Sequence, residues 1–232
     1  MNNEELIKKS EEIRKKTLDY RRKTKSSHIG SDLSSVEILT VLYYRLMNPQ
    51  DTFILSKGHA AGVFYTILND LKKIPDKEYL KLEGHPTLSL KYGISATTGS
   101  LGHGLSIGLG MAIADSKNKI YVLMGDGECD EGQVWEAART ASELKVNNLT
   151  SIVDCNGWQG LKNTYHQLLD ERFMAFGCNV IRCNGHDCKE LIDSLTNKIN
   201  PNKLNIILAT TLKAKGLPDL EDTLRSHYTC IQ

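Results

Sequence analysis

The stretch IYVLMGDGECDEGQVWEAARTASELKVNNLTSIVDCNGW, residues 120–158, decides the fold. Two short apolar runs, 120–124 and 149–154, flank a run at 131–144 whose apolar residues recur at helical spacing. This pattern predicts a β-α-β unit. Because such units pack their helices on a parallel sheet, we expect an α/β fold: a doubly wound, mostly parallel sheet with helices on both faces.

Polar side chains follow both predicted strands. Asp126 stands between Gly125 and Gly127 just past the first strand, and Asn156 follows the second. Right-handed crossover brings both to the carboxyl edge of the sheet, where open α/β folds bind their ligands. Their oxygens suit Mg²⁺, which usually keeps phosphate oxygens as further ligands, and the glycines would aim N–H groups at such a ligand. A β-α-β turn with a purely structural aspartate is the alternative that these residues leave open.

Composition favours one domain over residues 1–232. The chain is 40% hydrophobic, enough for a sizeable core, and its net charge of +1 comes without a basic, aromatic-rich stripe, so we expect no nucleic-acid partner. No apolar run approaches the roughly 20 residues of a membrane span. The charged N-terminus also lacks the apolar core of a signal peptide. We therefore expect a cytoplasmic protein with no membrane partner.

Six cysteines fit a reducing compartment. Cys178, Cys183 and Cys188 lie near His186, but their spacing matches no zinc knuckle, and a predicted strand joins the first two. Structural thiols are therefore favoured over a zinc site. Cys129 stands beside the predicted metal turn, and its role stays open.

Two more loops have the features of ligand-facing turns. A short strand at 53–55 runs into Ser56-Lys57-Gly58-His59, which places His59 at a strand-to-helix turn, where a lone histidine is more often structural than catalytic. The glycine-rich run 97–104 opens an apolar helix at 105–114, although close helix packing also explains some of its glycines. Further helices are expected at 4–25, 34–47 and 165–176, and further strands at 178–183 and 204–210.

These loops together resemble the N-terminal, thiamine diphosphate-binding domain of transketolase over nearly the whole chain. Gly125-Asp126-Gly127 followed by Asn156 resembles the diphosphate motif of thiamine diphosphate enzymes, and three histidines fall in the family's order. The remaining matches are Ser27-His28-Ile29-Gly30 to Ser-Gly-His-Pro-Gly, Ser56-Lys57-Gly58-His59 to Ser-x-Gly-His, Gly84-His85-Pro86 to Gly-His-Pro, Thr98-Gly99-Ser100-Leu101-Gly102-His103-Gly104 to Thr-Gly-Pro-Leu-Gly-Gln-Gly, Asn184-Gly185-His186-Asp187 to Asp-Gly-His-Asp, and Ser226-His227 to Trp-His.

The resemblance implies a cofactor site for thiamine diphosphate with Mg²⁺ or another divalent cation. Asp126, Asn156 and the carbonyl of Trp158 match the metal ligands, and the Gly127 N–H matches a diphosphate contact. The other matched cofactor positions are Gly99 and Leu101 beside the rings, His59 and His227 near the diphosphate, and Glu131, which in the family couples to the neighbouring active site across the dimer.

The resemblance also implies the catalytic groups. His28, His85 and His227 match histidines that contact the sugar hydroxyls and move protons, a task that suits imidazoles because their free pKa lies near neutrality. Ala214 departs from the family, since it replaces the first glycine of a Thr-x-Lys-Gly-x-Gly segment and leaves the backbone ahead of His227 less free.

In the family, the glutamate that activates the aminopyrimidine and the residues that bind the acceptor lie in the next domain. We therefore expect a subunit of a split transketolase, which moves a two-carbon ketol unit between sugars with a separately encoded C-terminal partner, as a heterotetramer. The alternatives are another thiamine diphosphate enzyme subunit, similar to deoxyxylulose phosphate synthase or to the α subunit of a 2-oxo acid dehydrogenase, and a non-catalytic paralogue. The resemblance does not identify the donor and acceptor sugars.

Overall fold

A five-stranded sheet forms the centre of the computed structural model, which describes residues 1–82 and 84–231. The strand order is β1-β2-β3-β5-β4, and every neighbouring pair is parallel. The strands are β1 (Thr52–Leu55), β2 (Ile120–Gly125), β3 (Leu149–Cys155), β4 (Asn179–Asn184) and β5 (Asn205–Thr210). The predicted α/β fold is confirmed, and each predicted strand lies within one or two residues of an observed one.

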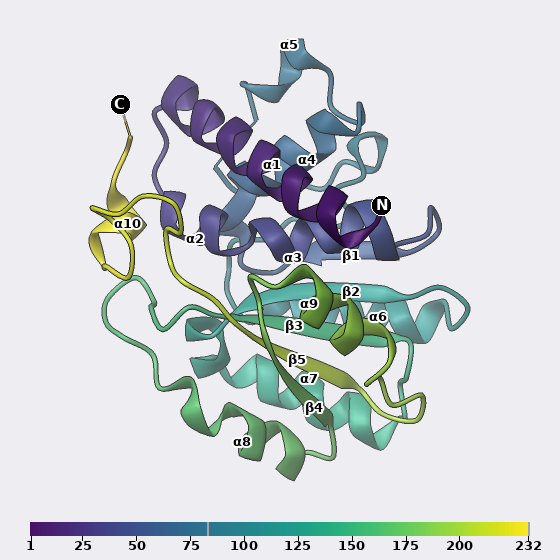
Figure 1. Ribbon diagram of the computed structural model, residues 1–232. Helices are drawn as coiled ribbons and strands as arrows, with labels where there is room; N and C mark the ends of the chain where they lie inside the picture. The colour runs from purple at the N-terminus through teal and green to yellow at the C-terminus, as the bar shows by residue number, and fades with distance from the viewer. Residues whose placement is uncertain (83, 232) are drawn as a thin grey trace.

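Helices connect these strands and cover both faces of the sheet (Figure 1). The α-helices are α1 (Asn3–Thr24), α2 (Ile29–Ser34), α3 (Val36–Val41), α4 (Ala61–Asp70), α5 (Asp76–Tyr79), α6 (His103–Ala114), α7 (Gly132–Glu143), α8 (Leu169–Ala175), α9 (Cys188–Thr196) and α10 (Arg225–Tyr228). A π-helical turn, η1 (Leu42–Leu46), and the 3₁₀ turns η2 (Gly58–Ala60), η3 (Leu90–Tyr92), η4 (Gly127–Asp130) and η5 (His166–Leu168) complete the set. Within the described residues, no helix is both long and apolar enough to cross a membrane.

Two hydrophobic cores lie on opposite faces of the sheet, because side chains alternate along each strand. In β2, Tyr121 and Leu123 join the core that includes α1, α3, α4 and α9, whereas Val122 and Met124 join the core that includes α6, α7 and α8. Burial on both faces explains why β2 reads as a continuous apolar run in the sequence.

The expected helix at 34–47 is divided in the structure. Helical structure begins earlier, directly after His28, which adopts the left-handed φ of 73°. The Ser35 hydroxyl donates back to the Ser31 carbonyl over 2.8 Å, where α2 gives way to α3. Such back-bonding competes with regular helix and favours a break of this kind.

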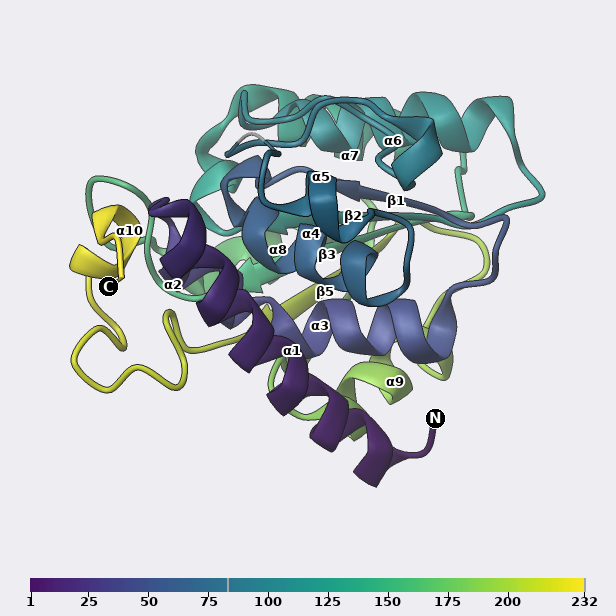
Figure 2. The ribbon, with the colours of Figure 1, turned by 90° about the horizontal axis from the view of Figure 1, so that it is seen from above.

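The C-terminal segment returns to α2, which stands early in the chain. Helix α10, near the C-terminus, packs on α2 in both views (Figures 1 and 2). The His28 N–H donates to the His227 carbonyl over 3.1 Å. This contact brings His227 beside the loop between α1 and α2, at the carboxyl edge of the sheet.

Candidate active site

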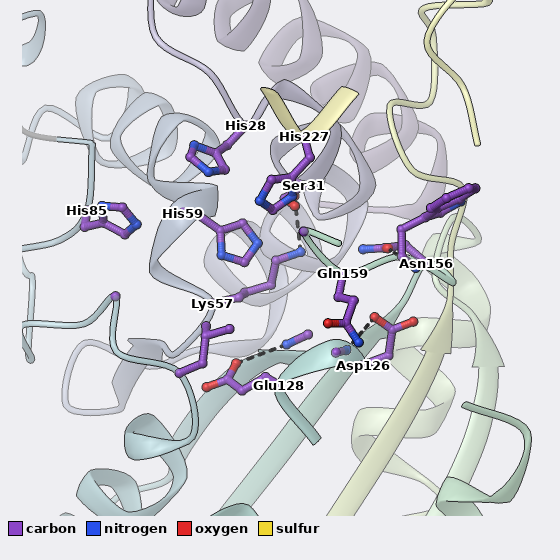
Figure 3. A pocket seen from close by; sticks show the side chains of 16 residues that line it. His28, Ser31, Lys57, His59, His85, Asp126, Glu128, Asn156, Gln159 and His227 are labelled. Atoms are coloured by element: carbon purple, nitrogen blue, oxygen red, sulfur yellow. Dashed lines mark hydrogen bonds between the residues drawn. The ribbon is translucent and has the colours of Figure 1, made fainter. Parts of the chain in front are cut away.

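The carboxyl ends of β1, β2 and β3 face a cavity of about 250 Å³ (Figure 3). In the view of Figure 3, four histidines gather on one side, and Asp126 of the predicted metal turn, residues 125–127, lies on the other. Every site residue predicted from the sequence lines this cavity except Glu131; these are His28, His59, His85, Gly99, Leu101, Asp126, Gly127, Asn156, Trp158 and His227. Loops that are distant in sequence therefore converge, as the predicted β-α-β unit requires.

Four imidazoles form one cluster. The His28 ring centroid lies 4.7 Å from that of His227, 5.5 Å from that of His59 and 6.1 Å from that of His85. Burial, with the positive charges of neighbouring groups, lowers the pKa of His28 and of His227 to about 4 and that of His59 well below 6.5. These three rings are therefore neutral at pH 7, and each offers one donor and one acceptor to a polar ligand.

The segment that precedes His227 packs against the loop at Gly30, although Ala214 stands where the family motif has a glycine. Ala214 adopts φ 60°, the left-handed conformation that glycine favours, and its N–H donates to the Gly30 carbonyl over 3.0 Å. This hydrogen bond holds the segment against the first loop. The substitution does not move His227 out of the cluster.

The buried guanidinium of Arg21 anchors the histidine loops from behind. Nε donates to Asp32 over 2.5 Å, and one terminal nitrogen donates to the Ser26 hydroxyl over 2.9 Å. The other terminal nitrogen donates to the His59 carbonyl over 3.1 Å. One side chain therefore fixes the loop that precedes His28 and the turn that carries His59.

Asp126, at the end of β2, is held from both sides of its carboxylate. Oδ1 accepts the Gly127 N–H over 2.8 Å, and Oδ2 accepts the Gly157 N–H over 2.7 Å and the Thr164 hydroxyl over 2.6 Å. Burial raises the pKa of Asp126 in spite of these hydrogen bonds. A cation would offset the cost of burying this charge.

Asn156 is oriented by a buried network behind it. Its Nδ2 donates to Asp154 over 3.0 Å, and its Oδ1 accepts the Trp158 N–H over 3.1 Å. Asp154 is fully buried and forms an ion pair with Lys57. Burial alone would raise the pKa of Asp154, but the Lys57 charge and the hydrogen bonds from Lys57, Ser34 and Thr211 together lower it below the usual value.

Lys213 is a buried lysine with no hydrogen-bond partner among the described residues. Its side chain is fully buried, and within the described part of the chain its Nζ has no hydrogen-bond acceptor. Nζ lies 5.9 Å from the centroid of the Trp158 ring, which lines the cavity. Burial and the charge of Lys57 lower the pKa of Lys213 to about 8. An anion is the partner that this position lacks, so the donor set fits a diphosphate held with a divalent cation.

Two glycine N–H groups that we expected to face a ligand have protein partners instead. The Gly125 N–H donates to Glu128 over 3.2 Å, and the Gly127 N–H donates to Asp126. The reason is local, because η4 turns Glu128 back beneath the strand end. Glu131 lies outside the cavity, exposed at the N-cap of α7, where its side chain makes no capping bond.

The cysteines contribute no site. Cys178, Cys183 and Cys188 are buried free thiols, and no three His, Cys, Asp or Glu side chains within residues 1–82 and 84–231 converge as metal ligands. His186 is committed elsewhere, with Nδ1 2.9 Å from Glu37 and Nε2 accepting the Leu212 N–H over 2.8 Å. Burial raises the pKa of the Cys129 thiol well above its usual value, which disfavours the reactive thiolate.

Sequence reasoning missed four residues that shape the site. Lys57 and Lys213 stand inside the segments that match Ser-x-Gly-His and Thr-x-Lys-Gly-x-Gly, so those motifs carried a signal. Arg21 and Glu128 had none, because a charged residue on a helix or beside a turn is usually solvated. Only their burial in the folded chain identifies them.

Comparison with known proteins supports the resemblance to transketolase. A family model described as "Transketolase, thiamine diphosphate binding domain" matches residues 7–232. The chain is 40% identical over 252 residues to one of the subunits of the apulose-4-phosphate transketolase of Actinobacillus succinogenes, covering 97% of this chain and 91% of that protein. It is 36% identical over 240 residues to a 6-deoxy-6-sulfo-D-fructose transketolase subunit of Clostridium sp., covering 93% and 87%.

A solved structure agrees in fold. The crystal structure of transketolase from Campylobacter jejuni superposes with a TM-score of 0.86 at 31% identity, covering 99% of this chain. The chain spans 41% of that longer protein.

Proposed function

This chain belongs to the transketolase family, whose thiamine diphosphate-binding domain it matches, and on that premise we propose that it is the N-terminal subunit of a two-subunit transketolase. With its partner it moves a two-carbon ketol unit from a ketose to an aldose. Two relatives that it resembles along most of their length are named as single transketolase subunits, which supports this division. Residues 1–232 then act as one domain.

The histidine cluster beside the metal turn is the observation that carries the proposal. His28, His59 and His227 lie within 5.6 Å of one another by ring centroids, next to Asp126 and Asn156 in the same cavity. Neutral imidazoles that can donate or accept suit a substrate with several hydroxyl groups. A 2-oxo acid offers no such row of hydroxyls, so the cluster favours a sugar over the substrate of a 2-oxo acid dehydrogenase.

Different residues would hold the divalent cation, the diphosphate and the rings of the cofactor. Asp126, Asn156 and the Trp158 carbonyl would hold Mg²⁺ or another divalent cation. The positive charge of Lys213, behind the Trp158 ring, would favour the diphosphate, and Gly127 would border it through the cavity wall. His59 and His227 would flank it, while Gly99 and Leu101 would line the rings. When bound, thiamine diphosphate supplies the nucleophile and the electron sink for making and breaking a carbon–carbon bond.

The chain's own contribution to the reaction is proton transfer and orientation. The Ser27 hydroxyl bonds Nδ1 of His28 at 2.9 Å, which leaves Nε2 of His28 for a sugar hydroxyl. His227 is neutral at pH 7 and can accept a proton from a hydroxyl, while His85 sits at the far side of the cluster and would contact the donor ketose.

A separately encoded C-terminal subunit would complete each site with the catalytic glutamate and the acceptor-binding residues. The exposure of Glu131 supports a contact with a neighbouring subunit, which we propose in a heterotetramer. A cytoplasmic location is supported by the six free cysteines. The intact metal turn argues against a non-catalytic paralogue.

The experiment compares the purified chain, alone and with titrated partner subunit, in a ketose-cleavage assay with thiamine diphosphate and Mg²⁺. We expect no turnover from the chain alone, and activity together with a steep gain in cofactor affinity on assembly, because two ligands that favour one state reinforce each other. Robust turnover by the lone chain, or assembly that leaves cofactor binding unchanged, would refute the split site.

A further inference from the structure

We propose that Glu128 is a positioning residue that ties the three cofactor-facing loops into one rigid unit. The proposal rests on the proposed function, since the loops that it joins are those assigned to thiamine diphosphate and Mg²⁺. Glu128 is 1% exposed and borders the cavity. Figure 3 shows its carboxylate below Lys57 and beside the metal turn.

Each contact of Glu128 belongs to a different loop. Oε1 accepts the Ser56 hydroxyl, at the start of the turn that carries His59, and the Gly102 N–H over 2.8 Å, at the end of the loop that carries Leu101. Oε2 accepts the Gly125 N–H over 3.2 Å, next to Asp126 in the metal turn. One side chain therefore bonds all three loops.

The joined loops also leave little room to move. Gly102 adopts φ 86°, and a Cβ there would lie 2.7 Å from the Glu131 Cβ. A Cβ at Gly104 would collide with Ser56. The carboxylate therefore acts inside a tight junction, where a hydrogen bond lost from one loop is not replaced by water without displacing a neighbour.

A direct role toward the cofactor explains these contacts less well. A carboxylate repels a diphosphate, and the three donors from the protein already occupy both oxygens of Glu128. Its effect on a ligand would then pass through the backbone of the loops. Residues of this kind commonly change metal or ligand affinity by about 10- to 100-fold when they are altered.

Glu128→Gln is the sharpest variant because it keeps the shape and removes one acceptor. Its amide NH₂ would face an N–H donor, and the arrangement that keeps the bonds to Ser56 and Gly102 places the NH₂ against the Gly125 N–H. We therefore expect Glu128→Gln to lose the hydrogen bond to the Gly125 N–H, next to Asp126, before the other two. Glu128→Ala releases all three loops, and Ser56→Ala releases one loop without altering a residue of the cavity wall.

The first measurement is amide hydrogen exchange of the full chain without cofactor, followed at the loops around Gly102 and Gly125. Glu128→Gln should speed exchange at Gly125 more than at Gly102, while the unfolding midpoint stays level or rises because a buried charge is removed. Asp70→Asn is the matched control, since Asp70 is a hydrogen-bonded carboxylate on α4 that does not line the cavity. Unchanged exchange at both loops in Glu128→Gln and Glu128→Ala would overturn the proposal.

The second measurement is calorimetric titration of thiamine diphosphate with Mg²⁺ into the chain assembled with its partner subunit. We expect affinity about tenfold weaker in Glu128→Gln, weaker also in Ser56→Ala, and less than multiplicative loss in the double variant, because both act through one junction. If the two substitutions weaken cofactor affinity independently, so that their effects multiply in the double variant, the proposed junction is refuted. Wild-type protein that does not bind the cofactor would refute the proposed function, and the exchange measurement would still decide whether Glu128 joins the loops.

Discussion

Replacing Lys213 with methionine should stabilise the free chain, because the lysine buries a charge that has no partner. Folding lowers the pKa of Lys213 from 10.5 to about 8, which corresponds to an upper limit of about 3 kcal/mol at 1.36 kcal/mol per pH unit. Water that reaches the cavity offsets part of this cost. We therefore expect Lys213→Met to raise the free energy of unfolding by about 1–3 kcal/mol at pH 7 without cofactor.

The pH dependence gives the sign of the effect. Between about pH 8 and 10.5 the unfolded chain holds a proton on Lys213 that the folded chain has lost, so wild-type stability rises with pH across that window. The advantage of Lys213→Met is fully present below about pH 8 and disappears toward pH 10.5. Urea unfolding at pH 7 and pH 10, in a chelator and without cofactor, measures this difference directly.

Lys57→Met is the matched control, because Lys57 is equally buried but paired with fully buried Asp154. Removing one partner of a buried ion pair typically costs about 3–5 kcal/mol, so the same substitution should have the opposite sign. With saturating thiamine diphosphate and Mg²⁺, Lys213→Met should lose its advantage and bind the cofactor roughly 10- to 100-fold more weakly, as expected for a charge-assisted hydrogen bond. A Lys213→Met chain that is less stable than wild type at pH 7, or a difference that does not change by pH 10, would refute the reasoning.

Three other variants or conditions test the roles of the remaining site residues. Asp126→Asn should fold and lose Mg²⁺-dependent cofactor affinity by roughly 10²-fold; calorimetry that finds unchanged affinity would remove Asp126 from the metal site. His85→Ala should bind cofactor nearly normally while kcat/KM for the donor ketose falls by roughly 10²-fold, and the reverse pattern would reassign His85 to the cofactor. Because folding lowers the pKa of His28 and His227 from 6.5 to about 4, stability should fall as the pH drops from about 6.5 toward 4, since the unfolded chain binds more protons there. His28→Gln and His227→Gln should flatten this acid limb, and an unchanged limb would contradict the assignment.

The sequence predicted the sheet and the loops at its carboxyl edge because both depend on short-range patterns. The β2-α7-β3 unit is visible in the spacing of apolar residues, and a parallel connection fixes which strand ends face the ligand. The same pattern is enough to predict that Asp126 and Asn156 lie at the ends of neighbouring strands. The histidines needed the resemblance, since a lone His59 at a turn has no chemical signature of its own.

The residues that the sequence did not reveal depend on burial, which is set by contacts distant in sequence. Arg21 lies on the amphipathic helix α1, whose other basic side chains are exposed or half-buried, and its contacts with Asp32 and the His59 carbonyl distinguish it from them. The division of the helix at Ser35 has the same origin, because the nearby Ser34 hydroxyl is drawn to Asp154 on β3 over 2.6 Å. Helix propensity cannot anticipate a partner 120 residues away.

The segment after β5 joins the metal side of the cavity to the histidine side. The Trp158 indole N–H donates to Asp222 over 2.6 Å, and the Tyr228 hydroxyl donates to the Gly160 carbonyl over 2.6 Å. His227, next to Tyr228, is in turn bonded to the His28 loop through its carbonyl. A shift of the loop at Gly160 must therefore move α10 or break the Tyr228 bond, and a movement of α10 would carry His227 with it. If the cavity binds the proposed cofactor, we expect the same short segment to couple that binding to the arrangement of His28 and His227.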